Sequence, residues 1–290
     1  PGALTRLAPA VERPGIHLGV SYDGDDLAVW GTVRRIPKYT CVVEVAEPGL
    51  LVVKHHRGDV HAKFVNLAVL QGDQVKIIDE DASTLPDCPS LLSTLLGFDS
   101  PASWAASTNV MVQLAVSMRA HKRGGLLLVV PAGSDAWRES VVQPLSYVAS
   151  PPFAELALLS RAAGDQDRGR AWHDDLERAV DAIAGLTAID GATILTSAYD
   201  VLTFGVKLAR RRGAPTVEQI MLTEPIEGRA ALIVGPTALG GLRHFSAAQF
   251  VHDQKDALAL VASQDGRFTV FAWSPCEVMV HAHRIEALLL

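Results

Sequence analysis

Two short motifs in this chain carry residue types that could bind a phosphorylated ligand and act on it. Their members are Asp190, Gly191 and Ala192 in the first motif, and Gly241, Leu242, Arg243 and His244 in the second. The first motif places a carboxylate beside a glycine, which lets a ligand approach the backbone. The second supplies an arginine, a histidine and free amides at a predicted helix start, where phosphate binds readily. Their order and their strand and helix context make the pair more specific than either motif alone.

Each motif also has a purely structural interpretation. Asp190-Gly191 is a common turn dipeptide, and Arg243-His244 could be a solvated helix start whose histidine bonds to a backbone carbonyl. The joint context favours a nucleotide site over these two interpretations. The loop at 235–241 superficially copies a phosphate-binding P-loop, but glycine and leucine stand at 241 and 242, where lysine and serine or threonine are required. This excludes a Walker NTPase.

Composition and charge limit the class of protein. The chain has 290 residues, 49% of them hydrophobic and 20% charged, which predicts a packed core and two modest domains. A net charge of -6 disfavours nucleic-acid binding, so any phosphate site must be local. No apolar run is long enough to predict a membrane segment. Three scattered cysteines, Cys41, Cys88 and Cys276, favour a reducing cytoplasm over a disulfide framework.

The first 98 residues show the pattern of a small β-rich domain. Short β-branched runs alternate with the turn signals Asp23-Gly24, Pro48-Gly49 and Gly72-Asp73. The predicted strands are 16–20, 27–33, 40–45, 50–54, 63–70 and 74–78. Prolines and a glycine at 85–100 interrupt this rhythm, so we place a domain boundary there, between residues 1–98 and 99–290.

The second domain, 99–290, alternates helical and strand patterns. Ser100 is the predicted cap of its first helix, and Gly124 ends that helix. The further predicted helices are 170–186 and 242–252, and the predicted strands are 126–130, 192–196, 201–208, 230–234, 257–263 and 268–273. This alternation predicts an α/β fold, a mixed central sheet flanked by helices.

The second domain resembles the diadenylate cyclase (DAC) domain, which joins two ATP molecules into the second messenger cyclic di-AMP. The resemblance spans 104–275. It includes the strand Gly124–Val129, the helix that leads into Asp190–Ile194, the segment Gly241–His244 and the final hairpin after Lys255-Asp256-Ala257. The first 98 residues are similar, by order and strand-rich pattern, to sensor domains of the DACNV type that precede some DAC domains.

The resemblance implies roles for individual residues. Asp190 would lie by the ribose 3′-hydroxyl and a Mg or Mn ion, and Arg243 and His244 would hold the triphosphate of ATP. The nucleotide pocket would be lined by Gly191, Ala192, Gly241, Leu242 and Ser263. Because phosphoryl transfer depends on positioning and charge stabilisation, these residue types suit it. Two ATP-loaded subunits must face each other, so the resemblance also implies a homo-oligomer.

The chain departs from the family pattern at three positions. Leu242 replaces a threonine and Phe245 replaces a second arginine, so two phosphate-facing polar groups are missing. Gln264 replaces an acidic metal ligand, for which Asp265 could substitute with a shift of one residue. We therefore predict a cytoplasmic diadenylate cyclase of weak activity. The alternatives are a catalytically inactive DAC-like nucleotide sensor that acts through a partner and, less favoured, a scaffold without nucleotide affinity.

Histidines form two groups that invite a metal interpretation. They are His55, His56 and His61 in the first domain, and His281 and His283 near the end of the chain. No cysteine or carboxylate completes either set convincingly, so we interpret them as surface histidines.

Overall fold

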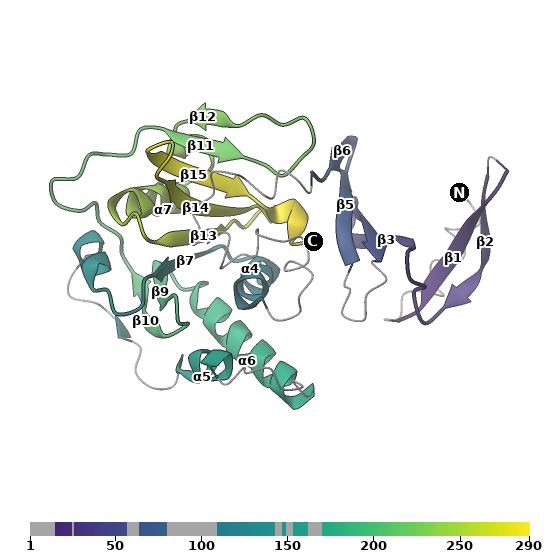
Figure 1. Cartoon of the computed structure of the whole chain (residues 1–290), viewed down its shortest axis with the longest axis horizontal. Coiled ribbons are helices and arrows are strands. Elements are labelled where there is room, and N and C mark those ends of the chain that lie inside the picture. Colours follow the sequence, from purple (N-terminus) through teal and green to yellow (C-terminus); the bar gives the residue numbers. More distant parts are fainter. Residues whose placement is uncertain are drawn as a thin grey trace.

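The computed structural model describes residues 15–24, 26–56, 64–79, 109–142, 147–148, 153–161 and 170–290. These residues form three sheets: a two-stranded hairpin, a four-stranded antiparallel sheet and a nine-stranded mixed sheet. Figure 1 shows the hairpin farthest from the large sheet, with the four-stranded sheet between them. The predicted boundary between 98 and 99 and the Ser100 cap lie outside the described residues.

The N-terminal strands follow the predicted ones to within a few residues. The hairpin consists of β1 (His17–Asp23) and β2 (Asp26–Val33). The four-stranded sheet consists of β3 (Cys41–Glu47), β4 (Leu50–His56), β5 (Phe64–Gln71) and β6 (Gln74–Ile77), in that order. These six strands therefore form two separate sheets, whereas the sequence predicted one β-rich unit.

The large sheet is assembled mainly from hairpins. Its order is β12 (Leu232–Val234), β11 (Ile220–Thr223), β15 (Met279–Arg284), β14 (Phe268–Ser274), β13 (Leu258–Ala262), β7 (Gly125–Val130), β9 (Ala192–Thr196), β10 (Val201–Val206) and β8 (Tyr147–Val148). Only the pairs β7 with β9 and β11 with β15 are parallel among the neighbours in this sheet. β7 pairs with β9 on one side and with β13 on the other, and this pairing of strands that are distant in sequence brings the two motifs together.

The α-helices of the described chain are four: α4 (Val110–Ala120), α5 (Glu155–Arg161), α6 (Arg170–Leu186) and α7 (Leu242–Asp253). Asn109 caps α4, because its side-chain oxygen accepts hydrogen bonds from the amides of Met111 and Val112. The helices predicted at 170–186 and 242–252 are confirmed as α6 and α7. β8, β11, β15 and α5 were not predicted.

The predicted α/β class, a DAC-type mixed sheet flanked by helices after one small β-rich domain, is wrong. Strands predominate over helices in the described residues, and two separate antiparallel sheets precede the large one. The physical reason lies in the connections. Short turns join β9 to β10, β13 to β14 and β14 to β15, and each of these turns makes neighbours antiparallel. Few of the strands are linked by a helical crossover.

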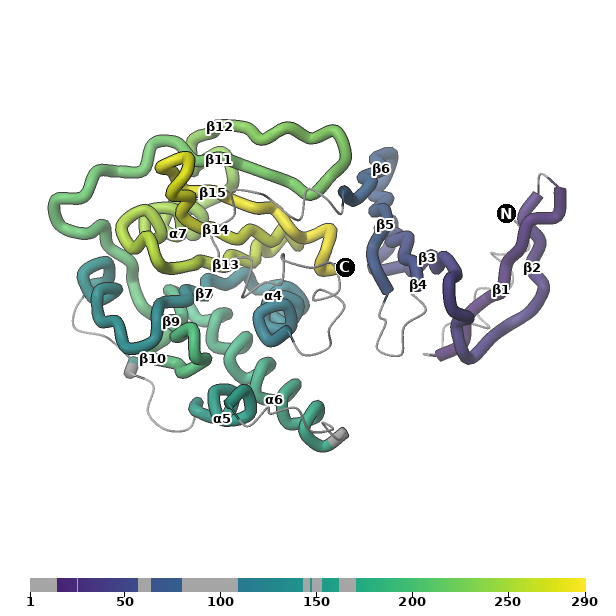
Figure 2. Tube along the Cα trace, in the orientation of Figure 1, coloured from purple at the N-terminus to yellow at the C-terminus, as the bar shows by residue number. Residues whose placement is uncertain are grey.

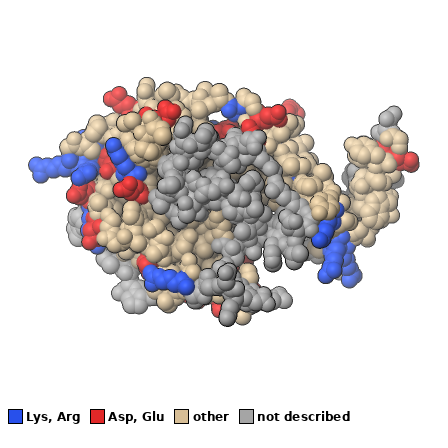
Figure 3. Space-filling model, viewed as in Figure 1, with Lys and Arg blue, Asp and Glu red and all other residues tan. Residues whose placement is uncertain are grey.

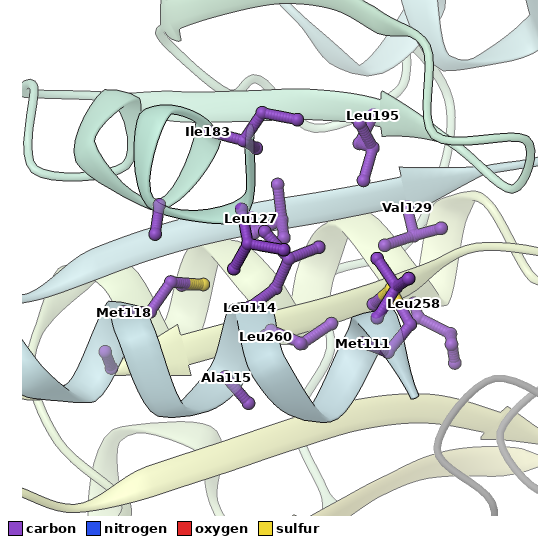
Figure 4. Close-up of a cluster of buried hydrophobic side chains, with 14 of the residues drawn as sticks. Met111, Leu114, Ala115, Met118, Leu127, Val129, Ile183, Leu195, Leu258 and Leu260 are labelled. Carbon is purple, nitrogen blue, oxygen red and sulfur yellow. The ribbon is translucent and has the colours of Figure 1, made fainter. Parts of the chain in front are cut away.

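Two hydrophobic clusters lie on the two sides of the large sheet. Alternate residues of β7 point to opposite sides, so Leu127 joins one cluster while Leu126 and Leu128 join the other. Figure 4 shows the first cluster, where α4 presents Leu114 and Met118 to β7 and β13. α7 packs on the other side, through residues such as Phe250. This packing fixes the start of α7 beside the end of β13.

The four-stranded sheet contacts the end of the chain. The Asn66 side-chain amide donates hydrogen bonds to the carbonyls of Ala287, at 3.0 Å, and Leu290, at 3.1 Å. Val52 and Val69 pack with Ala287 in a third, small cluster. Figure 2 shows the C-terminus beside this sheet. The described helices include none that is long and apolar enough to cross a membrane.

Candidate functional site

A cleft of about 770 Å³ lies where α7, β7, β10 and the turn after β13 meet. Both sequence motifs contribute to its wall. Its lining residues are Leu126, Asp190, Gly191, Lys207, Leu208, Gly241, Leu242, Arg243, His244, Ser246, Val261, Ala262, Ser263 and Gln264. The cleft has the size of an ordinary small-ligand pocket. Of the predicted site residues, Ala192 and Asp265 are not part of its lining.

The first motif follows the turn after α6. The Asp190 side chain is exposed, and within the described chain it has no hydrogen bond or ion pair, so its carboxylate is available to a ligand. Gly191 has a φ of 108°, and a Cβ placed there would lie 2.5 Å from the carbonyl carbon of Gly205. The close approach of β10 thus requires glycine here. Ala192 is buried in the core below the cleft.

The second motif starts α7. Gly241 is the N-cap, with no side-chain hydrogen bond at this helix start, and its carbonyl accepts bonds from the amides of His244 and Phe245. Leu242 is 79% exposed at the rim, where the expected threonine would have offered a hydroxyl. The cleft therefore contains the N-terminus of a twelve-residue helix, whose dipole favours an anion.

Arg243 is the principal cation of the cleft. Its guanidinium lies over the backbone of Gly124, since a Cβ on that glycine would come within 2.5 Å of Nη1. No hydrogen bond or ion pair holds the guanidinium among the residues that the structure describes. Its donors are therefore free for an anionic group, and the left-handed Gly124, with a φ of 71°, makes room for it.

His244 supplies an uncharged imidazole. The side chain is 4% exposed, and its ring meets that of Phe271 edge-on at 6.2 Å. Burial, and next the positive charge of Arg284, lower the pKa of His244 below its ordinary value. At neutral pH this imidazole can donate or accept a hydrogen bond, but it adds no positive charge.

The turn after β13 forms another part of the wall. Ser263 and Gln264 line the cleft, and the Gln264 amide donates to the Arg123 carbonyl at 3.3 Å. Asp265 instead forms an ion pair with Arg267, at 3.5 Å between Oδ2 and Nε. The structure therefore does not bring Asp265 into the cleft lining with Asp190. In the described residues no group of three or more His, Cys, Asp or Glu side chains could hold a metal ion.

Lys207 and Ser246 were missed by the sequence analysis. Lys207 follows β10 and reaches the cleft only because β10 pairs with β9. Together with Arg243 it gives two cations against the single carboxylate of Asp190, a lining charge of +1 within a chain of net charge -6. On the face drawn in Figure 3, basic and acidic side chains are interspersed, without one large basic patch. The positive character of the cleft is thus local.

The two histidine groups differ from their interpretation as surface residues. His281 and His283 are 4% and 2% exposed in β15, so that interpretation is wrong for this pair. Their apolar neighbours in the sheet bury them, and Thr223 Oγ1 lies 2.6 Å from His283 Nδ1. His55 and His56 are partly buried, and His61 lies outside the described residues.

Comparison with known families identifies one segment at the N-terminus. Residues 1–34 match the probable sensor domain DACNV. The match includes β1 and β2, and it confirms the predicted similarity for those residues alone. A search of curated proteins found no match to the chain. Because the match covers residues 1–34 alone, the resemblance of the second domain to diadenylate cyclases stays a prediction.

Proposed function

We propose that the cleft binds ATP and that the protein is a diadenylate cyclase-like signalling protein. The observation that carries this proposal is the meeting of both motifs in one cleft, with the free guanidinium of Arg243 beside the start of α7. A guanidinium and helix amides are the groups that recognise phosphate oxygens. The proposed product is cyclic di-AMP, formed from two ATP molecules with release of two pyrophosphates.

The residues of the cleft would share the tasks of this reaction. Arg243, the amides at the start of α7 and Lys207 would bind and neutralise the phosphates, and neutral His244 would add a hydrogen bond. Asp190 would accept the proton of the ribose 3′-hydroxyl as that oxygen attacks the α-phosphorus of the other ATP. Pyrophosphate leaves with the electrons of the broken bond. Positioning and charge stabilisation would supply most of the rate.

The cleft offers a divalent cation one protein carboxylate, so a bound ion would need further ligands from the substrate. Asp190 is the one carboxylate of the lining, and Mg²⁺ often binds through one or two carboxylates together with substrate phosphates. When bound, Mg²⁺ or Mn²⁺ would offset charge on the triphosphate. Each cleft would hold one ATP, so the cyclisation requires two clefts face to face and a homo-oligomer.

ATP binding tests the proposal directly. Replacing Arg243 with alanine should weaken ATP binding by about 1.5–3 kcal/mol, the range for a hydrogen bond to a charged group. Isothermal titration of the wild type and the variant measures this change, and adenosine should show far less of it. Arg267→Ala is the matched control, because Arg267 is exposed and pairs with Asp265 outside the cleft lining. Equal ATP affinity in all three proteins would refute the site.

A catalytically inactive nucleotide sensor is the second candidate function. Two observations favour it: Asp265 is paired outside the cleft lining, and the partly buried Phe245 packs against a hydrophobic cluster where the family has an arginine. Mass spectrometry after incubation with ATP and Mn²⁺ separates the two candidates. Cyclic di-AMP from the wild type that disappears in Asp190→Asn supports the cyclase. ATP binding without product supports the sensor.

A further inference from the structure

The turn between α4 and β7 carries several basic residues, and most of them are held by partners. Arg119 Nε donates to the carbonyl of Gly266 at 3.1 Å. Lys122 forms its ion pair with Glu47 on the side of the four-stranded sheet. Arg123 is exposed, and the structure gives its guanidinium no hydrogen bond or ion pair within the described residues. The charge of Arg123 is therefore available to a ligand.

Hydrogen bonds hold the backbone of Arg123 on both sides. Its amide donates to Nδ1 of His121 at 3.1 Å, and its carbonyl accepts from the side-chain amide of Gln264 at 3.3 Å. The second bond requires a donor at position 264, which an ionised glutamate could not provide. Because Gln264 also lines the cleft, this bond ties Arg123 to the cleft wall.

His121 completes this support as a neutral ring. Its Nδ1 accepts from the Arg123 amide, so the ring proton lies on Nε2, which is 3.3 Å from Thr187 Oγ1. Thr187 Oγ1 in turn donates to the carbonyl of Ala184 at 2.6 Å. Burial, and next the charge of Arg123, lower the pKa of His121, and the charge of Arg243 acts in the same direction. Both guanidiniums thus act on one imidazole.

Arg123 and Arg243 are neighbouring cations without a counter-ion among the residues that the structure describes. The Arg243 guanidinium lies over Gly124, the residue that follows Arg123. Two carboxylates of this region, Glu47 and Asp265, are already paired with other cations. Like charges repel each other, and a ligand with several negative charges removes that repulsion. The pair of arginines therefore favours a polyanion.

We propose that Arg123 is a second phosphate-binding arginine of the cleft, which contacts the part of a triphosphate that extends past Arg243. This inference rests on the proposed binding of ATP. Arg123 is not part of the cleft lining, whereas its partner Gln264 is, so Arg123 stands at the rim and meets the end of the ligand that projects outward. The cleft thus selects nucleoside polyphosphates over monophosphates. Arg123 supplies, from another element, the guanidinium that Phe245 cannot offer.

Isothermal titration with ATP and with AMP tests this role. Arg123→Ala should weaken ATP binding by about tenfold, the lower end for a hydrogen bond to a charged group, because the position is exposed. The affinity for AMP, which lacks the outer phosphates, should stay the same. Arg123→Lys should recover part of the ATP affinity, since it keeps the charge but loses the planar fork of donors. Lys122→Ala is the matched control: it removes one positive charge from the adjacent position, but that charge is paired with Glu47.

The possible results separate this inference from the proposed function. If Arg243→Ala weakens ATP binding and Arg123→Ala does not, the cleft still binds ATP and Arg123 has no part in it. Equal losses in Arg123→Ala and Lys122→Ala would reveal a general effect of charge and overturn the inference. Equal losses for ATP and AMP would show that Arg123 supports the turn instead of contacting the outer phosphates. A wild type that does not bind ATP would refute the proposed function, and this inference with it.

Discussion

Arg243 and Phe245 are two residues apart on α7 and meet different surroundings. Successive residues of a helix turn by about 100°, so positions 243 and 245 point to nearly opposite sides. Arg243 lines the cleft, whereas Phe245 packs on the cluster between α7 and the sheet. The position of the motif's second arginine is therefore held by a partly buried packing residue in this chain, and a charged side chain at 245 would lose this packing.

Replacing Phe245 with arginine tests this assignment. Arginine should lower the free energy of unfolding by about 1–3 kcal/mol, because it removes apolar contacts and places a charge at a partly buried position. Urea unfolding of the wild type and variant measures the loss. Leu242→Arg is the control, since Leu242 is 79% exposed at the rim of the cleft and should tolerate the charge. A Phe245→Arg protein of wild-type stability that makes more cyclic di-AMP would show that residue 245 faces the phosphates.

Sequence reasoning found the cleft residues that belong to motifs and missed those that tertiary pairing brings in. Asp190, Arg243 and His244 are marked by their neighbours in the chain. Lys207 has no such context, and only the pairing of β10 with β9 carries it to the cleft. The sequence also could not show why residue 191 is glycine. The group that approaches Gly191 closely is the backbone of β10, which is distant from any local motif.

Among the elements, the connection from α4 to β7 supports the side of the cleft that contains Arg243. Lys122 and Gly124 both have positive φ, at 53° and 71°, which turns the chain sharply into β7. Lys122 forms an ion pair of 2.7 Å with Glu47 of the four-stranded sheet. The Lys122 ammonium lowers the pKa of Glu47, mainly through its hydrogen bond to the carboxylate and also through its charge. The turn thus touches the N-terminal sheet on one side and Arg243 on the other.

Replacing Gly124 with alanine should disturb both the turn and the cleft. The left-handed backbone costs alanine about 1 kcal/mol, and its Cβ would collide with the Arg243 guanidinium. We expect lower stability and weaker ATP binding, measured by urea unfolding and calorimetry. Gly133→Ala separates the two effects, because Gly133 has a φ of 78° with no atom within 4 Å of a Cβ there. If both variants bind ATP like the wild type, Gly124 does not position Arg243.

The elements that the sequence predicted best are those with uninterrupted apolar patterns. β7 and β13 are buried at every position, and α6 carries a clear amphipathic pattern. β15 was missed because its histidines at 281 and 283 look polar, although both are buried against neighbouring strands. β11 was missed because it is only four residues long and draws its partner, β15, from much later in the chain.

At the scale of the whole molecule, the end of the chain joins the N-terminal sheet to the large sheet. Asn66 binds the carbonyls of Ala287 and Leu290, and an isolated bridge pairs Ile78 with Ile226. These contacts link residues more than 140 positions apart. Local patterns cannot reveal such contacts, which is why the sequence predicted separate units but not how they meet.

Burial of His283 couples the stability of the molecule to pH. Desolvation, and next the charge of neighbouring His281, lower the pKa of His283 from 6.5 to about 3. Between these two values the unfolded chain binds a proton that the folded chain does not. The contribution of His283 is therefore fully present above pH 6.5 and is lost as the pH falls toward 3, at about 1.4 kcal/mol per pH unit.

Replacing His283 with asparagine should remove this dependence, because asparagine does not titrate and its amide can occupy the place of Nδ1 beside Thr223. Lowering the pH from 7 to 5 should cost the wild type about 2 kcal/mol more of its unfolding free energy than the variant loses. Urea unfolding of both proteins at each pH measures the difference. The comparison cancels the pH dependence that other titrating groups contribute equally to both proteins. These groups include His121 and Glu286: burial lowers the pKa of His121 and raises the pKa of Glu286. Parallel pH profiles would show that His283 takes up its proton without unfolding the sheet around it.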